Sequence, residues 1–106
     1  MNQQIKEEHW HDPDGNPAGG MSCGVGFAIS WQNGPLGRGK QRREPNGAFV
    51  ESIIQAAIGR LQFYQSGKFN CEENRAALIF LDNAKEALQN RTKDREKRRV
   101  EGTHAE

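Results

Sequence analysis

The stretch VESIIQAAIGRLQFYQSGKFN, residues 50–70, decides how the chain is expected to fold. Its apolar residues recur at intervals of three and four, which is typical of an amphipathic helix. These residues are Val50, Ile53, Ile54, Ala57, Ile58, Leu61 and Tyr64. We expect Asn46 to cap this helix and Gly67 to end it. Asn70, with Glu73 three residues later, predicts a capping box at the start of a second helix.

The second helix is predicted from about Cys71 to roughly Arg98, after a loop so short that the two helices should pack as an antiparallel hairpin. Its apolar stripe consists of Ala77, Leu81, Ala84 and Leu88. The same spacing reaches Asn74 at one end of the helix and Arg91 and Arg95 at the other, so these polar residues are predicted on the buried face. Two arginines one turn apart suit a phosphate, although pairing with carboxylates of a neighbouring helix is the competing interpretation.

The residues before the helices predict a small β region. Residues 1–22 are dense in Pro, Gly, Asp and Asn and are interpreted as a polar N-terminal arm. Residues 24–31, GVGFAISW, predict a half-buried strand, because apolar side chains alternate along them. Residues 38–44 are considered as its polar partner strand. The predicted fold class is therefore α+β, with a β region and Gly-rich basic loop over 23–45 and a helical hairpin domain with a basic tail over 46–106.

Composition indicates one small, polar domain. The chain has 106 residues, 34% hydrophobic and 27% charged, so it has little material for a core and is expected to associate with copies of itself. The net charge of +1 argues against a general polyanion binder. No apolar run approaches membrane-spanning length and no signal-peptide core is apparent, so the cell interior is expected. Cys23 and Cys71 are expected to be free thiols, as in a reducing compartment.

A short match to a P-loop occurs at Gly34, Gly39 and Lys40, which satisfy G-x-x-x-x-G-K. The next residue is Gln41, where the motif needs a hydroxyl for Mg²⁺, and Pro45 opposes the helix that should follow. An NTP-hydrolysing site is therefore not expected. What remains is a basic loop that either contacts an anion or is a solvated turn. Its cations are Arg38, Lys40, Arg42 and Arg43.

No catalytic or metal site is predicted. His9, His11 and Asp12 could be considered as metal ligands, but two histidines in a polar arm without a fuller ligand set are expected to be surface residues. Trp10 and Trp31 are interpreted as packing anchors. No Ser/His or Cys/His arrangement is apparent in the sequence.

Several segments together resemble phage-encoded Thoeris anti-defence proteins and their relatives among the anti-CBASS nucleotide sponges, which share the helical hairpin. The segments are HWHDPDGNPAGG, GVGFAISWQNGPLGRG, EPNGAFVE, RLQFYQSGKF, CEENRAAL and RTKDREKRRVEGTH, between His9 and His104. The resemblance implies a protein that is not an enzyme. It implies binding and sequestration of cyclic ADP-ribose isomers made by TIR-domain immune proteins in the host bacterial cytoplasm, and for some members also of cyclic trinucleotides.

The resemblance also implies roles for individual residues. Tyr64 matches an aromatic that stacks on adenine, and Asn74 matches an amide that reads the base edge. Arg91 and Arg95 match a pair of arginines on the pyrophosphate. A loop arginine should correspond to Arg38, with Arg42 and Arg43 as the alternatives.

Helix geometry then predicts a shared pocket. Asn74 and Arg91 are 17 residues apart, so their backbones should be roughly 25 Å apart on one helix. One ligand can touch all the predicted residues only if two chains contribute, which predicts a homodimer. A higher homo-oligomer, such as a hexamer, is the alternative assembly. Two other classes stay open: a small regulator that binds nucleic acid, and a structural or partner-binding hairpin.

Overall fold

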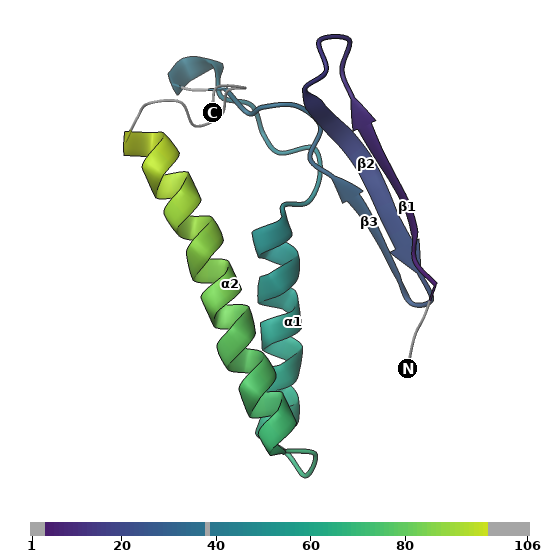
Figure 1. The fold of residues 1–106 in the computed structure, drawn as a ribbon, viewed down its shortest axis with the longest axis vertical. Helices are drawn as coiled ribbons and strands as arrows, with labels where there is room; N and C mark the ends of the chain where they lie inside the picture. Colours follow the sequence, from purple (N-terminus) through teal and green to yellow (C-terminus); the bar gives the residue numbers. More distant parts are fainter. Residues whose placement is uncertain (1–3, 38, 98–106) are drawn as a thin grey trace. The chain divides into compact units, whose positions relative to one another are not determined.

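The computed structural model describes residues 4–37 and 39–97, which divide into one compact unit up to Phe49 and another from Val50. The first unit contains a three-stranded antiparallel sheet in the order β1-β2-β3, and the second contains two helices (Figure 1). The predicted α+β class is confirmed. The elements are β1 (Lys6–His11), β2 (Pro17–Gly24), β3 (Phe27–Trp31), the 3-10 turn η1 (Gly39–Gln41), α1 (Val50–Gln65) and α2 (Glu72–Lys97).

The prediction of a polar arm over residues 1–22 is wrong for most of the described part, because β1 and β2 pair there as an antiparallel hairpin. The Pro/Asp/Gly-rich stretch is only the turn between them. The Asp12 carboxylate accepts hydrogen bonds from the backbone N–H groups of Asp14 and Asn16, both at 2.9 Å. This is the local side-chain bonding that makes Asp a turn residue.

Glycine allows β2 to lie against its neighbour where a larger residue could not. A Cβ on Gly20 would collide with the backbone carbonyl oxygen of Glu8 on β1. The strand is therefore built from residues of low strand propensity, which is why the hydrophobic pattern does not reveal it.

The alternating stretch forms a strand as predicted, but a shorter one. β3 begins at Phe27, whereas Gly24 ends β2 and pairs with Phe27 across the turn. Gly26 has a φ of 87°, a conformation that favours glycine, and so provides the tight connection. Val25 lies in this turn and is 82% exposed.

The predicted partner strand over residues 38–44 is wrong. In the described part of that stretch, the single turn η1 replaces a strand. Instead, Ala48 forms an isolated parallel bridge with Trp31 of β3, since its N–H donates to Ser30 O at 2.7 Å.

Asn46 is not the cap of α1, which begins four residues later. Its side chain instead accepts a hydrogen bond from Asn33 N at 2.8 Å and donates to Asn33 O at 3.1 Å. Its backbone N–H donates to Gln32 Oε1 at 2.8 Å. These amide contacts hold together the two ends of the loop over 33–46, which is thereby a compact Ω-type loop.

The first helix, α1, begins later than predicted but ends beside Gly67 as predicted, and the Gly67 N–H donates to Tyr64 O at 3.2 Å. The cap of α2 is Cys71 rather than Asn70, because Cys71 Sγ accepts from Asn74 N at 3.4 Å. The Asn70 side chain is engaged elsewhere and donates to Gly67 O at 2.8 Å.

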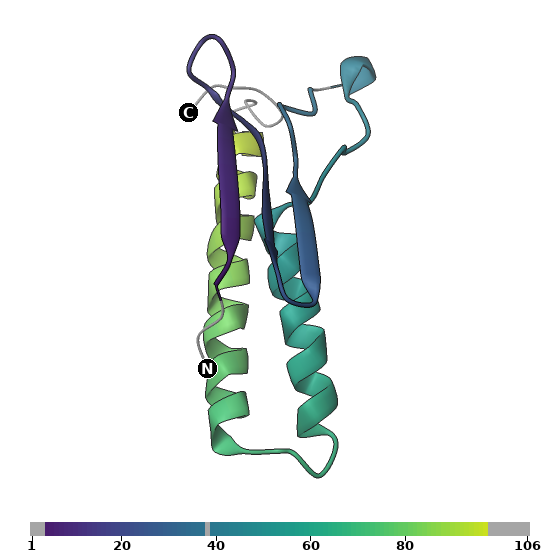
Figure 2. The same cartoon turned by 90° about the vertical axis from the view of Figure 1, so that its right-hand side faces the viewer.

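The two helices lie side by side, joined by the loop over 66–71 (Figure 2). Lys85 Nζ donates to Gln55 Oε1 at 2.8 Å between them. Among the described residues, Ile58 is the buried hydrophobic side chain, with 2% exposure. Phe63, Phe69 and Phe80 are all more than 60% exposed. The helical unit of a single chain thus leaves much apolar surface open to solvent.

Candidate functional site

Tyr64 lies in the last turn of α1 and is half-buried. Arg60, one turn earlier, donates from Nε to the Tyr64 hydroxyl at 3.2 Å, and its Cζ is 5.0 Å from the ring centre. The ring of Phe63 is 6.0 Å away from the Tyr64 ring. Arg60 was not among the site residues predicted from the sequence. The available signal was its spacing, since residues three and four apart share a helix face.

Asn74 lies in the first turn of α2 and is half-buried, as predicted. Its Nδ2 donates to Phe69 O at 3.3 Å, so the side chain braces the loop that joins the helices. Tyr64, at the end of α1, and Asn74, at the start of α2, therefore flank the loop that joins the two helices and lie at the same end of the helical unit.

Arg91 and Arg95 lie near the other end of α2. Arg95 is half-buried as predicted, but Arg91 is exposed, so its predicted place on the buried face is wrong. The half-buried face follows alternate steps of four and three through Asn74, Leu78, Leu81, Lys85 and Leu88. That spacing leaves Arg91 beside the face.

The predicted residues do not meet within one chain. α2 is continuous from Glu72 to Lys97, so the 17 residues between Asn74 and Arg91 separate their backbones by roughly 25 Å. Within one chain, the loop end of the helical unit carries Tyr64 and Asn74, and the far end of α2 carries Arg91 and Arg95.

The basic loop is organised by Arg43. Its Nη2 donates to Pro35 O at 2.7 Å and its backbone N–H donates to Leu36 O at 2.7 Å. Arg42 and Arg43 are both exposed, but Arg43 is part of the loop framework through these two bonds. Arg38, the preferred loop candidate, lies outside the described residues. Lys40 is exposed within η1 and no helix follows before Val50, which excludes P-loop geometry here.

The sheet contains the two histidines considered as metal ligands. His9 and His11 lie on β1, and His9 Nε2 is 4.0 Å from a carboxylate oxygen of Glu7. Within residues 4–37 and 39–97, no group of three or more His, Cys, Asp or Glu side chains is arranged to hold a metal ion. Trp31 is an anchor, since its Nε1 donates at 2.9 Å to Ser22 Oγ, which is 4% exposed.

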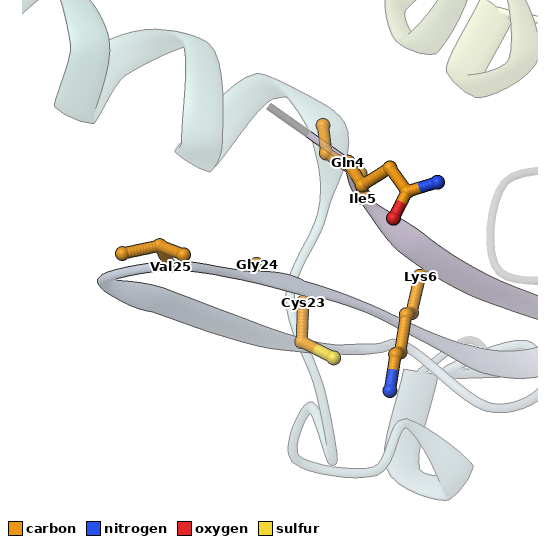
Figure 3. Close-up of a pocket in the computed structure, with 6 residues that line it drawn as sticks. All are labelled: Gln4, Ile5, Lys6, Cys23, Gly24 and Val25. Carbon is orange, nitrogen blue, oxygen red and sulfur yellow. The ribbon is translucent and has the colours of Figure 1, made fainter. Parts of the chain in front are cut away.

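A cavity of about 640 Å³ opens at the end of the sheet where β1 starts and β2 ends. Figure 3 shows its lining residues, Gln4, Ile5, Lys6, Cys23, Gly24 and Val25. Lys6 and Cys23 are cross-strand partners there. Among the described residues, the predicted ligand-binding residues Tyr64, Asn74, Arg91 and Arg95 do not line this cavity.

Two predictions from composition can be compared with the described residues. Cys23 and Cys71 are free thiols, as predicted. No helix within the described residues combines the length and apolar character that crossing a membrane requires.

The small sheet followed by two helices agrees with the α+β fold that the sequence predicts. The chain is similar to Thoeris anti-defense 1 of Bacillus phage SBSphiJ7, with 41% identity over 76 residues. The match covers 72% of this chain and 51% of that protein, so the chain spans about half the length of the curated relative it matches. No protein-family model matches the chain. This similarity confirms the resemblance to Thoeris anti-defence proteins.

Proposed function

We propose that this chain counteracts the Thoeris defence system by binding and sequestering a cyclic nucleotide signal in the host bacterial cytoplasm. The observation that carries the proposal is the 41% identity to a Thoeris anti-defence protein over 72% of the chain. The ligand class is a cyclic ADP-ribose isomer, and cyclic trinucleotides are a further candidate. The protein acts by affinity and performs no reaction on the nucleotide.

The chemistry of the residues supports this ligand class. The Tyr64 ring can stack on a base, because every base has a flat π face. The Asn74 amide still has an acceptor oxygen and a second N–H to offer to a base edge. Arg91 and Arg95 offer planar forks of donors that suit the two phosphates of a pyrophosphate.

The separation of these residues supports a shared pocket. The contact between Gln55 in the first half of α1 and Lys85 at the middle of α2 fits an antiparallel helical hairpin, whose loop end carries Tyr64 and Asn74. In a two-fold assembly the loop end of one chain can meet the arginine end of its partner, giving two equal pockets. The exposed phenylalanines of the helical unit would supply apolar contact area in such a homodimer or a larger homo-oligomer.

The proposal is tested by titration calorimetry with a panel of cyclic ADP-ribose isomers and cyclic trinucleotides. We expect tight binding of at least one isomer, loss of that binding in Tyr64→Ala and Arg91→Ala, and recovery of the intact nucleotide after heat denaturation. Lys40→Ala is the control and should stay within about twofold of wild type, because an exposed lysine outside the pocket contributes little. Failure of every isomer to bind would refute the ligand class, and recovery of a hydrolysed nucleotide would refute the non-enzymatic mechanism.

A further inference from the structure

The side chain of Arg60 is held across two aromatic rings on the exposed side of α1. Its Cζ lies 5.1 Å from the ring centre of Phe63 and 5.0 Å from that of Tyr64. The two rings are inclined by 52° to each other. A guanidinium within about 6 Å of a ring centre is attracted by the π face. Together with the hydrogen bond to the Tyr64 hydroxyl, these contacts fix a side chain that would otherwise be mobile.

Most of the hydrogen-bonding capacity of Arg60 is unused within the described part of the chain. A guanidinium has five N–H donors, and the bond from Nε to Tyr64 uses one of them. Arg75, another exposed arginine of the helical unit, differs in this respect. Its Nη2 lies 2.9 Å from Glu72 Oε2 and its Nε donates to the same oxygen at 3.2 Å, so a carboxylate already neutralises it.

We propose that Arg60 is a further ligand-binding residue of the same site, and that it binds the phosphate groups of the nucleotide whose base stacks beside Tyr64. This inference rests on the proposed function. A planar guanidinium with its Nη groups open matches two phosphate oxygens at once. Because the aromatic contacts already order the side chain, binding loses less side-chain entropy than it would with a free arginine.

A role through Tyr64 alone makes a different prediction. If Arg60 acted only through its hydrogen bond to the Tyr64 hydroxyl, removing that hydroxyl would abolish its contribution. If it only supported the ring through the π contact, its contribution would persist without the hydroxyl but would not depend on salt. If Arg60 binds phosphate, its contribution persists without that hydroxyl and depends on salt, because the interaction joins two opposite charges.

The test measures the Kd of cyclic ADP-ribose and of its isomers by calorimetry for wild type, Arg60→Ala, Arg60→Lys, Tyr64→Phe and the double variant Arg60→Ala/Tyr64→Phe. Arg75→Ala is the matched control. We expect Arg60→Ala to weaken binding about tenfold or more, as for a lost charge-assisted hydrogen bond, and Arg75→Ala to leave it within about twofold. Arg60→Lys should retain part of the affinity, because it keeps the charge and loses the fork.

Two further results distinguish direct binding from support of the ring. Arg60→Ala should weaken binding as strongly in the Tyr64→Phe background as in wild type, and it should reduce the dependence of Kd on salt concentration. An Arg60→Ala chain that folds and binds like wild type overturns the inference while leaving the proposed function intact, as does an effect that vanishes in the Tyr64→Phe background. Absence of binding by wild type overturns the proposed function itself.

Discussion

Mixing two differently disabled chains should rebuild nucleotide-binding sites that neither chain forms alone. One chain carries Tyr64→Ala and Asn74→Ala, and the other carries Arg91→Ala and Arg95→Ala. The roughly 25 Å between the two ends of α2 prevents one chain from supplying both sets of contacts to one ligand. A pocket between chains takes one set from each, so a mixed pair retains one complete pocket.

The expected amount of recovered binding follows from counting pockets. After equal mixing and full exchange, each half of a pocket is intact with a probability of one half. Roughly one quarter of the pockets should therefore be complete, whether the assembly is a dimer or a larger ring of such pairs. Mixing either disabled chain with wild type is the control. Such a mixture should leave about one half of the pockets complete, because the substitutions then affect only one of the two halves of each pocket.

The assay is titration calorimetry, whose stoichiometry reports the fraction of complete pockets. Subunit exchange is established independently by native mass spectrometry with one chain isotopically labelled. If exchange is complete and no binding returns, the shared pocket is refuted. Full binding by either disabled chain alone would equally show that the four residues do not serve one ligand.

Two predictions concern the fold. Gly20→Ala should lower the free energy of unfolding by about 1–3 kcal/mol, because its Cβ would meet the carbonyl oxygen of Glu8. Gly59→Ala on α1 should raise the free energy of unfolding by up to about 1 kcal/mol, because a Cβ there meets nothing within 4 Å and alanine favours the helix. Urea unfolding measures both, and an unaffected Gly20→Ala chain would contradict the pairing of β1 with β2. Asn46→Ala should lower the free energy of unfolding by about 1 kcal/mol, because its side-chain hydrogen bonds to Asn33 are lost. Asn46→Asp should lower it less, because the side chain keeps an oxygen that accepts from Asn33 N. Equal losses in the two variants would mean that this acceptor contributes nothing.

The helices could be predicted because their information is local. Apolar spacing identified α1 and α2, and Gly67 marked the end of α1. The residues that cap the helices were harder to predict, because several neighbouring side chains can accept a hydrogen bond from the same backbone N–H. Asn70 has the stronger preference for a cap, yet its side chain bonds to Gly67 O and the thiol of Cys71 takes the position.

The sheet could be predicted only in part, since β3 alone has an alternating apolar pattern. β1 is polar apart from Trp10, and β2 contains glycines whose role depends on a neighbouring backbone. The placement of Tyr64 and Asn74 near one loop followed from the short connection between the helices. The exposure of Arg91 could not be predicted in this way, because a small error in helical phase accumulates over the length of α2.

The polarity of β1 has a consequence for the assembly of the protein. β1 is an edge strand of the sheet, and every one of its residues is exposed. An edge strand is a template on which another chain can add its own strand without limit. Glu7 and Glu8, with Lys6 beside them, place charges along this edge, so two such edges meet with carboxylates near one another. These charged residues give β1 no alternating apolar pattern, and they also oppose the addition of a strand from another chain to this edge.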